Sequence, residues 1–316
     1  MSGATDAPFR RQAVRFGARA VVSEMVAGEA LATGRPDMVR RTCRHDGDGA
    51  WIVQLAARRP EDMKAGAHLL AKAGVDIIDI NMGCPARKVT GGQSGSALMR
   101  APDLAESIME AALEGAGHVP VTLKMRLGWD HEMLNAPHLA RVAERLGLKW
   151  LTVHGRTRCM FYKGEADWAA IADTVDAVDL PVIANGDIDS LPAARTCLAD
   201  SGAHAVMIGR AAMGRPWLVA EIEAGLAGVT FKAPILDEQL DSLCEQIEDS
   251  VSLYGERLGV RIVRKHVAAA IDMVDLPLGE DCRRELRGRL CRIDDAGELR
   301  AALASVYQHK RERVAA

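Results

Sequence analysis

Several residues that could take part in chemistry stand just past short apolar runs of this 316-residue chain. The run DIIDINMGCP carries Asn81 and Cys84 near its end. An ordinary cysteine thiol is protonated near neutral pH and can serve as a general acid. A lone cysteine is more often a small buried hydrophobe, so both roles stay open for Cys84 on position alone.

Basic side chains follow two further runs. In VTLKMR, Lys124 alternates with Thr122 and Arg126, so one face of this segment is polar near its end. A lysine that points into a protein interior needs an anionic partner, because an unpaired buried charge is costly. That partner is either a bound anion or a neighbouring carboxylate with a structural role. His154, in LTVHGRTR, is likewise either a core histidine or a donor to an anion.

Two glycine-containing turns close the last two runs. NGD spans residues 185–187 and IGR spans residues 208–210, while Gln54 adds a polar group in the earlier run VQL. Glycine lets backbone N–H groups approach a ligand closely and adopt a positive φ. Single turn glycines are common, but a matched pair after the last two strands of a barrel is typical of a phosphate site.

These segments need a framework in which strand ends meet. From residue 18 to residue 209, short apolar runs alternate with amphipathic stretches, which predicts an α/β fold with a parallel sheet covered by helices. The spacing is typical of a TIM (β/α)8-type barrel, which places its chemistry at the carboxyl ends of the strands. Seven of the eight strands are visible, in residues 18–23, 51–55, 76–80, 119–125, 150–153, 181–184 and 205–208.

The chain changes character after the last of these runs. Apolar residues then recur at helical spacing, which predicts a small all-helical domain. We expect a barrel domain over residues 1–228, a linker over 229–236 and a helical domain over 237–313. Charge is segregated there: residues 235–256 hold seven acidic residues and no Lys or Arg, and residues 257–313 hold 13 Lys or Arg against nine acidic residues. A basic helix face could track phosphates, although charged helices are usually only solvated.

The composition excludes several classes of protein. Hydrophobic residues make up 48%, so the chain is not mainly disordered, and no window reaches the ~18 uninterrupted apolar residues of a membrane span. With a net charge of −3, any polyanion must be met by a local patch. Seven scattered cysteines without a C-x-x-C pair argue against disulfides and a metal site and fit a reducing compartment. The N-terminus shows no signal-peptide pattern, and we expect a cytoplasmic monomer.

The motifs together resemble one known family. SGATDAPFR, VSEM, DINMGCPARKVTGGQSGSALM, TLKMRLGW, TVHGRTR, ANGDI and MIGRAAMGRPW are similar to segments of the tRNA-dihydrouridine synthases. RIVRKHV, near the C-terminus, resembles the DusB-like branch of that family. The resemblance covers essentially the whole chain, and NMGCP followed by GSALM is its most specific part.

The resemblance implies an FMN-bound barrel and a helical tRNA-binding domain. It implies that Cys84 is the proton donor and that Asn81 lies near the uracil. The residues that would hold FMN are Met1, Ser2, Gln54, Lys124, His154, Asn185, Gly186, Asp187, Gly209 and Arg210. The residues that would contact tRNA are Arg261, Arg264, Lys265 and His266.

The activity implied is FMN-dependent reduction of a uridine in the tRNA D-loop to 5,6-dihydrouridine. Hydride would pass from flavin N5 to C6, a proton would pass from Cys84 to C5, and NADPH would reduce the flavin again. The family's first strand and its Pro-Met turn have no counterpart before Met1, so we expect the natural product to be longer. One alternative is a tRNA-binding protein with impaired flavin chemistry, and another is a flavoenzyme that acts on a small pyrimidine.

Overall fold

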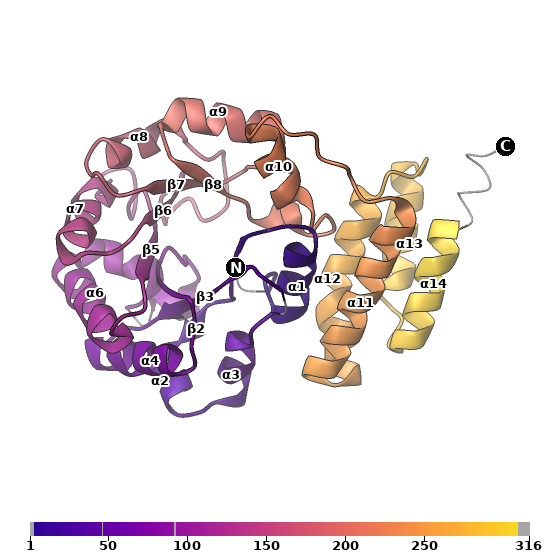
Figure 1. Ribbon diagram of the computed structural model, residues 1–316, viewed down its shortest axis with the longest axis horizontal. Coiled ribbons are helices and arrows are strands. Elements are labelled where there is room, and N and C mark those ends of the chain that lie inside the picture. The colour runs from indigo at the N-terminus through magenta and orange to yellow at the C-terminus, as the bar shows by residue number, and fades with distance from the viewer. Residues whose placement is uncertain (1–2, 46, 92, 309–316) are drawn as a thin grey trace. The chain divides into compact units, whose positions relative to one another are not determined.

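The computed structural model describes residues 3–45, 47–91 and 93–308, which form two compact units (Figure 1). The barrel unit contains residues 19–44 and 48–209, and the helical unit contains residues 3–18, 45, 47 and 210–308. The domain limits expected from the sequence stay a prediction.

The barrel unit is built on one parallel sheet. Its strand order is β1-β3-β4-β5-β6-β7-β8, with the short β2 also paired to β3, so that seven strand positions follow one another around the sheet. All seven predicted runs are strands, which confirms the α/β fold and its seven strand positions. The strands are β1 (Ala20–Val22), β2 (Val26–Ala27), β3 (Ala50–Ala56), β4 (Ile77–Met82), β5 (Val121–Arg126), β6 (Leu151–His154), β7 (Val182–Asn185) and β8 (Ala205–Met207).

Helices cover the outer face of this sheet, as Figure 1 shows for α4, α6, α7, α8 and α9. Proline pre-sets the backbone in the first turn of α4, α6, α7 and α9, and Gly147 ends α7 at φ 91°. The helices are α2 (Gly28–Ala32), α3 (Pro36–Thr42), α4 (Pro60–Lys72), α5 (Arg87–Thr90), η1 (Gly95–Arg100, a 3₁₀ helix), α6 (Pro102–Ala116), α7 (Ala136–Leu146), α8 (Ala169–Val175) and α9 (Leu191–Ser201).

The alternation of side chains along β5 explains how polar groups reach the interior. Leu123 and Met125 are fully buried on one face of the strand. Thr122, Lys124 and Arg126 share the opposite face, because successive side chains of a strand point to opposite sides. In a barrel one face packs on the helices and the other lines the interior, so the polar set is held inside.

The helical unit has its own apolar core, which confirms the expected helical C-terminal region. Ile247, Val263 and Leu303 belong to this core, and each is almost fully buried. Asp6 caps the first helix, since its side chain accepts a hydrogen bond from the Phe9 N–H at 3.3 Å. The helices are α1 (Ala7–Arg15), η2 (Arg210–Ala212, a 3₁₀ helix), α10 (Leu218–Leu226), α11 (Leu236–Tyr254), α12 (Glu256–Met273), α13 (Glu280–Leu290) and α14 (Ala296–Gln308).

Candidate active site

The strand register brings five of the sequence-predicted site residues to one belt of the barrel unit. Asn81 on β4 stands opposite Lys124 on β5, and His154 on β6 stands opposite Asn185 on β7. Gln54 on β3 is joined to this belt by a 2.6 Å hydrogen bond from the Asn81 amide. The belt lies at the carboxyl ends of the strands, where barrels of this type carry their chemistry.

Asn185 organises one half of the belt. Its Nδ2 donates to the Met207 carbonyl at 2.8 Å, so its Oδ1 faces Lys124, whose Nζ donates to it at 2.8 Å. The same oxygen lies 2.8 Å from Nδ1 of His154. Because an amide oxygen only accepts, Nδ1 of His154 must carry the proton, and Nε2 is left as an acceptor.

Burial sets the charges of this group. It lowers the pKa of His154 to about 3, with the positive charges of Lys124 and Arg126 adding to the effect, so the imidazole is neutral near pH 7. Burial also lowers the pKa of Lys124 to about 8, and Arg126 adds to that shift. Within the described residues the Lys124 ammonium donates to an amide oxygen and forms no ion pair. A partly buried ammonium in this setting fits an anionic ligand.

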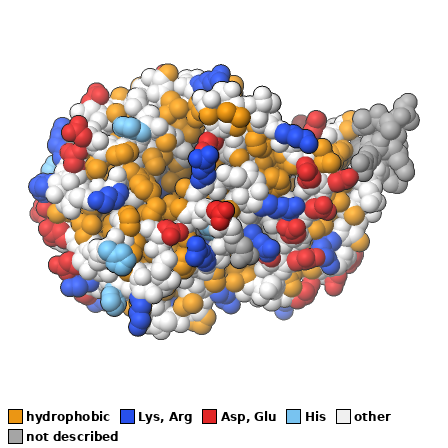
Figure 2. Space-filling view, in the orientation of Figure 1, with side chains coloured by type: hydrophobic (Ala, Val, Ile, Leu, Met, Phe, Trp, Pro, Cys, Tyr) orange, Lys and Arg blue, Asp and Glu red, His pale blue; other side chains and the backbone are white. Residues whose placement is uncertain are grey.

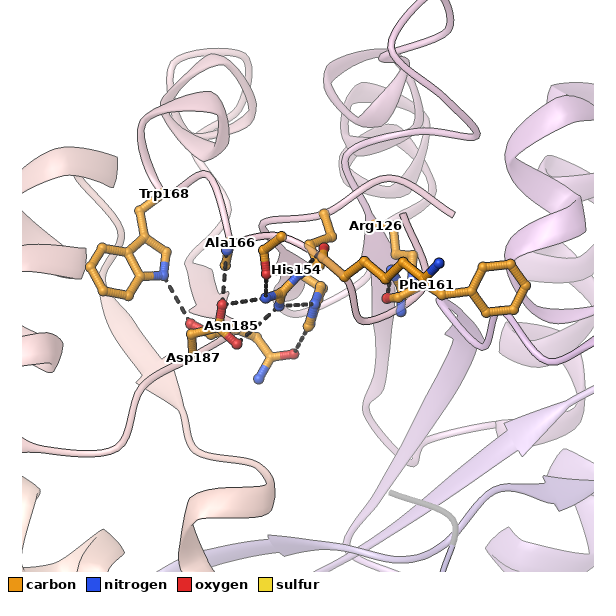
Figure 3. A network of polar contacts seen from close by, with 11 residues as sticks. Arg126, His154, Phe161, Ala166, Trp168, Asn185 and Asp187 are labelled. Atoms are coloured by element: carbon orange, nitrogen blue, oxygen red, sulfur yellow. Dashed lines mark hydrogen bonds and ion pairs between the residues drawn. The ribbon is translucent and has the colours of Figure 1, made fainter. Parts of the chain in front are cut away.

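The turn after β7 is held by an ion pair that the sequence did not reveal. Arg156 contacts both carboxylate oxygens of Asp187, and the Ala166 N–H donates to the same carboxylate at 2.9 Å (Figure 3). Burial raises the pKa of Asp187, but the hydrogen bonds from Arg156 and the Ala166 N–H and the positive charge of Arg156 together outweigh it, so the net direction is down. Gly186 has φ 123° and Asp187 has φ 54°, which is rare for a residue with a side chain. These partners hold a strained turn beside His154.

Arg126 ties two loops together beneath the same edge of the sheet. Its Nε donates to the Gly83 carbonyl at 2.8 Å, and NH1 donates to the carbonyls of Thr157 and Phe161 at 2.8 and 2.9 Å. Burial lowers its pKa to about 10, so the guanidinium stays charged near neutral pH. The Phe161 end of this contact is drawn in Figure 3. Arg126 therefore joins the turn before Cys84 to the loop after β6.

Cys84 is half-buried in the turn after β4. Its N–H donates to Asn81 Oδ1 at 3.0 Å, and its carbonyl accepts from the Ser96 hydroxyl at 2.8 Å. Gly95 closes this loop at φ 61°, where an added Cβ would lie 2.9 Å from the Cys84 carbonyl. The backbone N–H and the backbone carbonyl of the predicted proton donor are thus both hydrogen-bonded.

Sequence reasoning missed Asp79, which lies under the belt on β4. The carboxylate is 3% exposed and accepts from Gln54 Nε2 at 2.7 Å and from the Thr122 hydroxyl at 2.8 Å. The signal was present in DIIDIN, because Asp79 and Asn81 stand two residues apart and so share a strand face. Burial raises the pKa of Asp79, while both hydrogen bonds oppose that shift.

The remaining predicted FMN residues are not all placed at this site. Gly209 lies two residues past β8, at the end of the barrel unit. Arg210 begins the segment that belongs to the helical unit. Met1 and Ser2 lie outside the described residues.

The predicted tRNA residues separate into different environments on α12. Arg261 is exposed and Lys265 half-exposed. Arg264 donates to the Ile293 carbonyl at 2.8 Å and pairs with Asp294. His266 is 1% exposed and stacks on Phe9 with ring centroids 5.0 Å apart, so it lies in the interior of the helical unit and not on the face of Arg261.

The belt as a whole can bind a polar heterocycle with negative charge and place a thiol beside it. Amide groups supply directed donors and acceptors, and Lys124 supplies positive charge. Within residues 3–45, 47–91 and 93–308, no group of three or more His, Cys, Asp or Glu side chains is placed to hold a metal ion. In the same ranges, no helix is long and apolar enough to cross a membrane.

Comparisons with known proteins point to one family. The family model described as "Dihydrouridine synthase (Dus)" matches residues 1–305. A "Probable tRNA-dihydrouridine synthase" of Rhodobacter capsulatus is 46% identical over 312 residues, which cover 98% of this chain and 94% of that protein. "tRNA-dihydrouridine synthase B" of Pseudomonas putida is 42% identical over 315 residues, which cover 99% and 91%. Among solved structures, morphinone reductase with tetrahydroNAD aligns at a TM-score of 0.49, with 16% identity over 75% of this chain and 86% of that one.

Proposed function

This chain belongs to the dihydrouridine synthase family, and from that premise we propose that it reduces a uridine in the tRNA D-loop to 5,6-dihydrouridine. We propose FMN as its bound cofactor, NADPH as the reductant and the cytoplasm as its location. The observation that carries the proposal is the belt that joins the Cys84 turn, through Asn81 and Gln54, to the strand edge that bears Lys124.

The residues of the belt fit an FMN group. Lys124 is a partly buried ammonium that donates to a neutral amide, so an anionic ring edge would complete its surroundings. Gly186 adopts φ 123°, which residues with a side chain rarely adopt, and His154 beside it is neutral, with Nε2 left as an acceptor. We propose that Gln54, Lys124, His154 and the turn at residues 185–187 hold the cofactor. Gly209 and Arg210 remain proposed phosphate contacts from their place after β8.

Cys84 would provide the proton in this reaction. The thiol proton passes to C5 of the uracil, and the thiolate left on Sγ takes a proton back from solvent. When bound, FMN supplies hydride from N5 to C6, and NADPH restores it. Asn81 would orient the uracil, because its amide lies in the belt and is hydrogen-bonded to the backbone of Cys84. Lys124 would stabilise negative charge that develops at the ring system.

The helical unit would bind the tRNA body. Arg257, Arg261 and Lys265 are spaced four residues apart and therefore share one face of α12. Within the described part of the chain, none of the three forms an ion pair. Free basic side chains on one helix face fit the phosphates of a folded RNA.

A complementation experiment tests the proposal. Dihydrouridine is mapped in tRNA from a deletion strain that carries the wild type, Cys84→Ala or the control Cys43→Ala, whose cysteine follows α3. We expect Cys84→Ala to retain flavin absorbance and lose about 10²-fold or more in rate, the size of a general-acid effect. Wild-type levels with Cys84→Ala would contradict the role of the thiol. A colourless protein that binds tRNA without modifying it would instead support the tRNA-binding alternative.

A further inference from the structure

A buried carboxylate lies at the start of a hydrogen-bonded chain that ends at the Cys84 turn. Asp79 accepts from Gln54 Nε2 at 2.7 Å, and Gln54 Oε1 accepts from Asn81 Nδ2 at 2.6 Å. Asn81 Oδ1 then accepts from the N–H groups of Gly83 and Cys84 at 3.2 and 3.0 Å. Three side chains on two adjacent strands thus connect the interior of the barrel to the backbone of the proposed proton donor.

The two ends of this chain determine the orientation of both amides. A carboxylate oxygen at one end accepts a hydrogen bond, so Gln54 must turn its NH₂ group to Asp79 and its oxygen to Asn81. Backbone N–H groups at the other end only donate, so Asn81 must turn its oxygen to Cys84 and its NH₂ group to Gln54. An amide can otherwise adopt either of two orientations of similar shape. Here the carboxylate at one end and the backbone N–H groups at the other end require the same orientation of both amides.

We propose that Asp79 is a positioning residue that fixes the Gln54 and Asn81 amides and, through them, the Cys84 turn. This inference rests on the proposed function for its catalytic consequence, but the chain of contacts does not. Each NH₂ group uses one hydrogen within the chain and keeps one for a further acceptor. Asp79 therefore also decides that both amides present a donor hydrogen, and not only oxygen lone pairs, to a ligand in the belt.

The groups around Asp79 favour this role over simple pairing of charges. Its second oxygen accepts from the Thr122 hydroxyl at 2.8 Å, so both oxygens are hydrogen-bonded to neutral donors. Lys124 on the same strand as Thr122 favours the charged carboxylate, but its ammonium donates to Asn185. A carboxylate buried among neutral donors adds little stability by itself, because desolvation offsets its attraction to distant charge. What distinguishes Asp79 is that its carboxylate only accepts hydrogen bonds, so it determines which end of the Gln54 amide faces it.

Three variants separate the positioning role from a structural one. Asp79→Leu removes the acceptor for Gln54. Asp79→Asn keeps an oxygen for Gln54 and can donate its NH₂ group to the Thr122 oxygen, so it should preserve the chain. Thr122→Val is the matched control, because it removes an equally buried hydrogen bond to the same carboxylate but leaves the chain intact.

The first measurement is amide hydrogen exchange in the peptide that contains Gly83 and Cys84, which needs no activity. We expect exchange at least about tenfold faster in Asp79→Leu, since the opening free energy falls by about the worth of one hydrogen bond, and near wild type in Asp79→Asn and Thr122→Val. Unchanged exchange in Asp79→Leu would overturn the proposal even if the protein proved to have another activity.

The second measurement is dihydrouridine formation with flavin-loaded protein. In Asp79→Leu we expect kcat to fall about 10- to 100-fold, the scale of a misplaced catalytic group, with KM for tRNA changed less than about threefold. The double variant Asp79→Leu/Gln54→Ala should be no slower than Gln54→Ala alone, because Asp79 reaches Asn81 only through Gln54. The proposal would be contradicted if the losses in kcat multiplied in the double variant. Equal losses in kcat for Asp79→Asn and Asp79→Leu would contradict it as well. An inactive wild type would refute the proposed function and leave the exchange result as the test of the chain.

Discussion

Lys124 is the partly buried cation of the belt, and we expect its protonation to affect ligand binding. Its pKa of about 8 lies below that of an exposed lysine because burial disfavours the ammonium. The protonated form therefore dominates at pH 7 and is lost as the pH rises through about 8. His154 beside it is neutral over the same range, since its pKa is about 3.

The affinity for FMN should follow this titration. We expect a dissociation constant that is steady from pH 7 to about 8 and then rises by up to about tenfold per pH unit, because binding requires the charged lysine. Lys124→Arg keeps its charge throughout and should remove that rise. Quenching of flavin fluorescence by the flavin-free protein measures both constants, and an identical rise in the two proteins would exclude Lys124 as its source.

The Arg156–Asp187 pair should carry much of the stability of the turn after β7. Asp187→Ala leaves a guanidinium that is 3% exposed without its carboxylate, and we expect the free energy of unfolding to fall by about 3–5 kcal/mol. Asp187→Asn should lose less, because asparagine accepts a hydrogen bond and tolerates the φ of 54°. Denaturant unfolding at pH 7 measures the loss of stability in both variants. Equal losses would argue against a contribution from the hydrogen bond and the backbone conformation that asparagine retains at residue 187.

The same pair gives a pH dependence with a defined sign. The pKa of Asp187 is lowered in the folded protein, so the stabilisation is present above about pH 4, the value of an unfolded aspartate, and is lost as the pH falls. The difference in unfolding free energy between wild type and Asp187→Ala should therefore shrink below pH 4. A difference that stays constant down to pH 2 would contradict this assignment.

At the scale of elements, the basic side chains of α12 and α13 divide into two groups. Arg283 reaches five backbone carbonyls between Ile271 and Leu278, so it closes the C-terminal end of α12. Arg284 and Arg287 form ion pairs with Asp281 and Asp272. Arg257, Arg261 and Lys265 stand apart from these internal contacts. We therefore expect an RNA to contact the second group.

Substitutions should separate the two groups. Arg283→Ala is expected to destabilise the protein by about 2–4 kcal/mol, because buried carbonyls lose a charged donor. Arg261→Ala should leave stability within about 0.5 kcal/mol, as for an exposed side chain, and weaken tRNA binding. Thermal unfolding and a tRNA titration at one salt concentration measure the two effects. Weaker tRNA binding by an Arg283→Ala variant that is fully folded would contradict the separation of Arg283 from the tRNA-binding side chains.

The acidic side chains of α11 form ion pairs with arginines of two other helices. Asp249 and Glu245 pair with Arg11 and Arg15 of α1 at 2.6 and 2.7 Å, and Glu248 pairs with Arg300 of α14. The acidic run thus connects α11 to two neighbouring helices of its own unit. On the face drawn in Figure 2, basic and acidic side chains are correspondingly mixed.

At the scale of the whole molecule, a net charge of −3 means that tRNA binding must be local and sensitive to salt. We expect the logarithm of the association constant to fall linearly with the logarithm of salt concentration. Lys265→Ala or Arg261→Ala should each reduce the slope by about 0.7–0.9, the contribution of one phosphate contact. An association constant that does not change with salt, or a slope that is unchanged in both variants, would refute the phosphate-binding face on α12.

Much of the fold was predictable because it depends on local patterns. Each of the seven apolar runs is a strand whose ends lie within two residues of the predicted ones. The belt was predictable in part, since parallel strands align their carboxyl ends whatever the loops contain. The roles of Arg156 and Asp79 were not predictable, because their partners lie 31 and 25 residues away in the chain.

The sequence by itself determined the family, the α/β fold with its helical C-terminal region and the strand ends at which Cys84, Lys124 and Asn185 stand. Residue type, spacing and alternation are local properties, and all of them are present in the sequence before the chain folds. Only the tertiary structure decided that His266 is interior, that Arg283 closes a helix and that Asp79 connects to the Cys84 turn. Burial and hydrogen-bond direction depend on partners that are distant in sequence, so they exist only once the chain has folded.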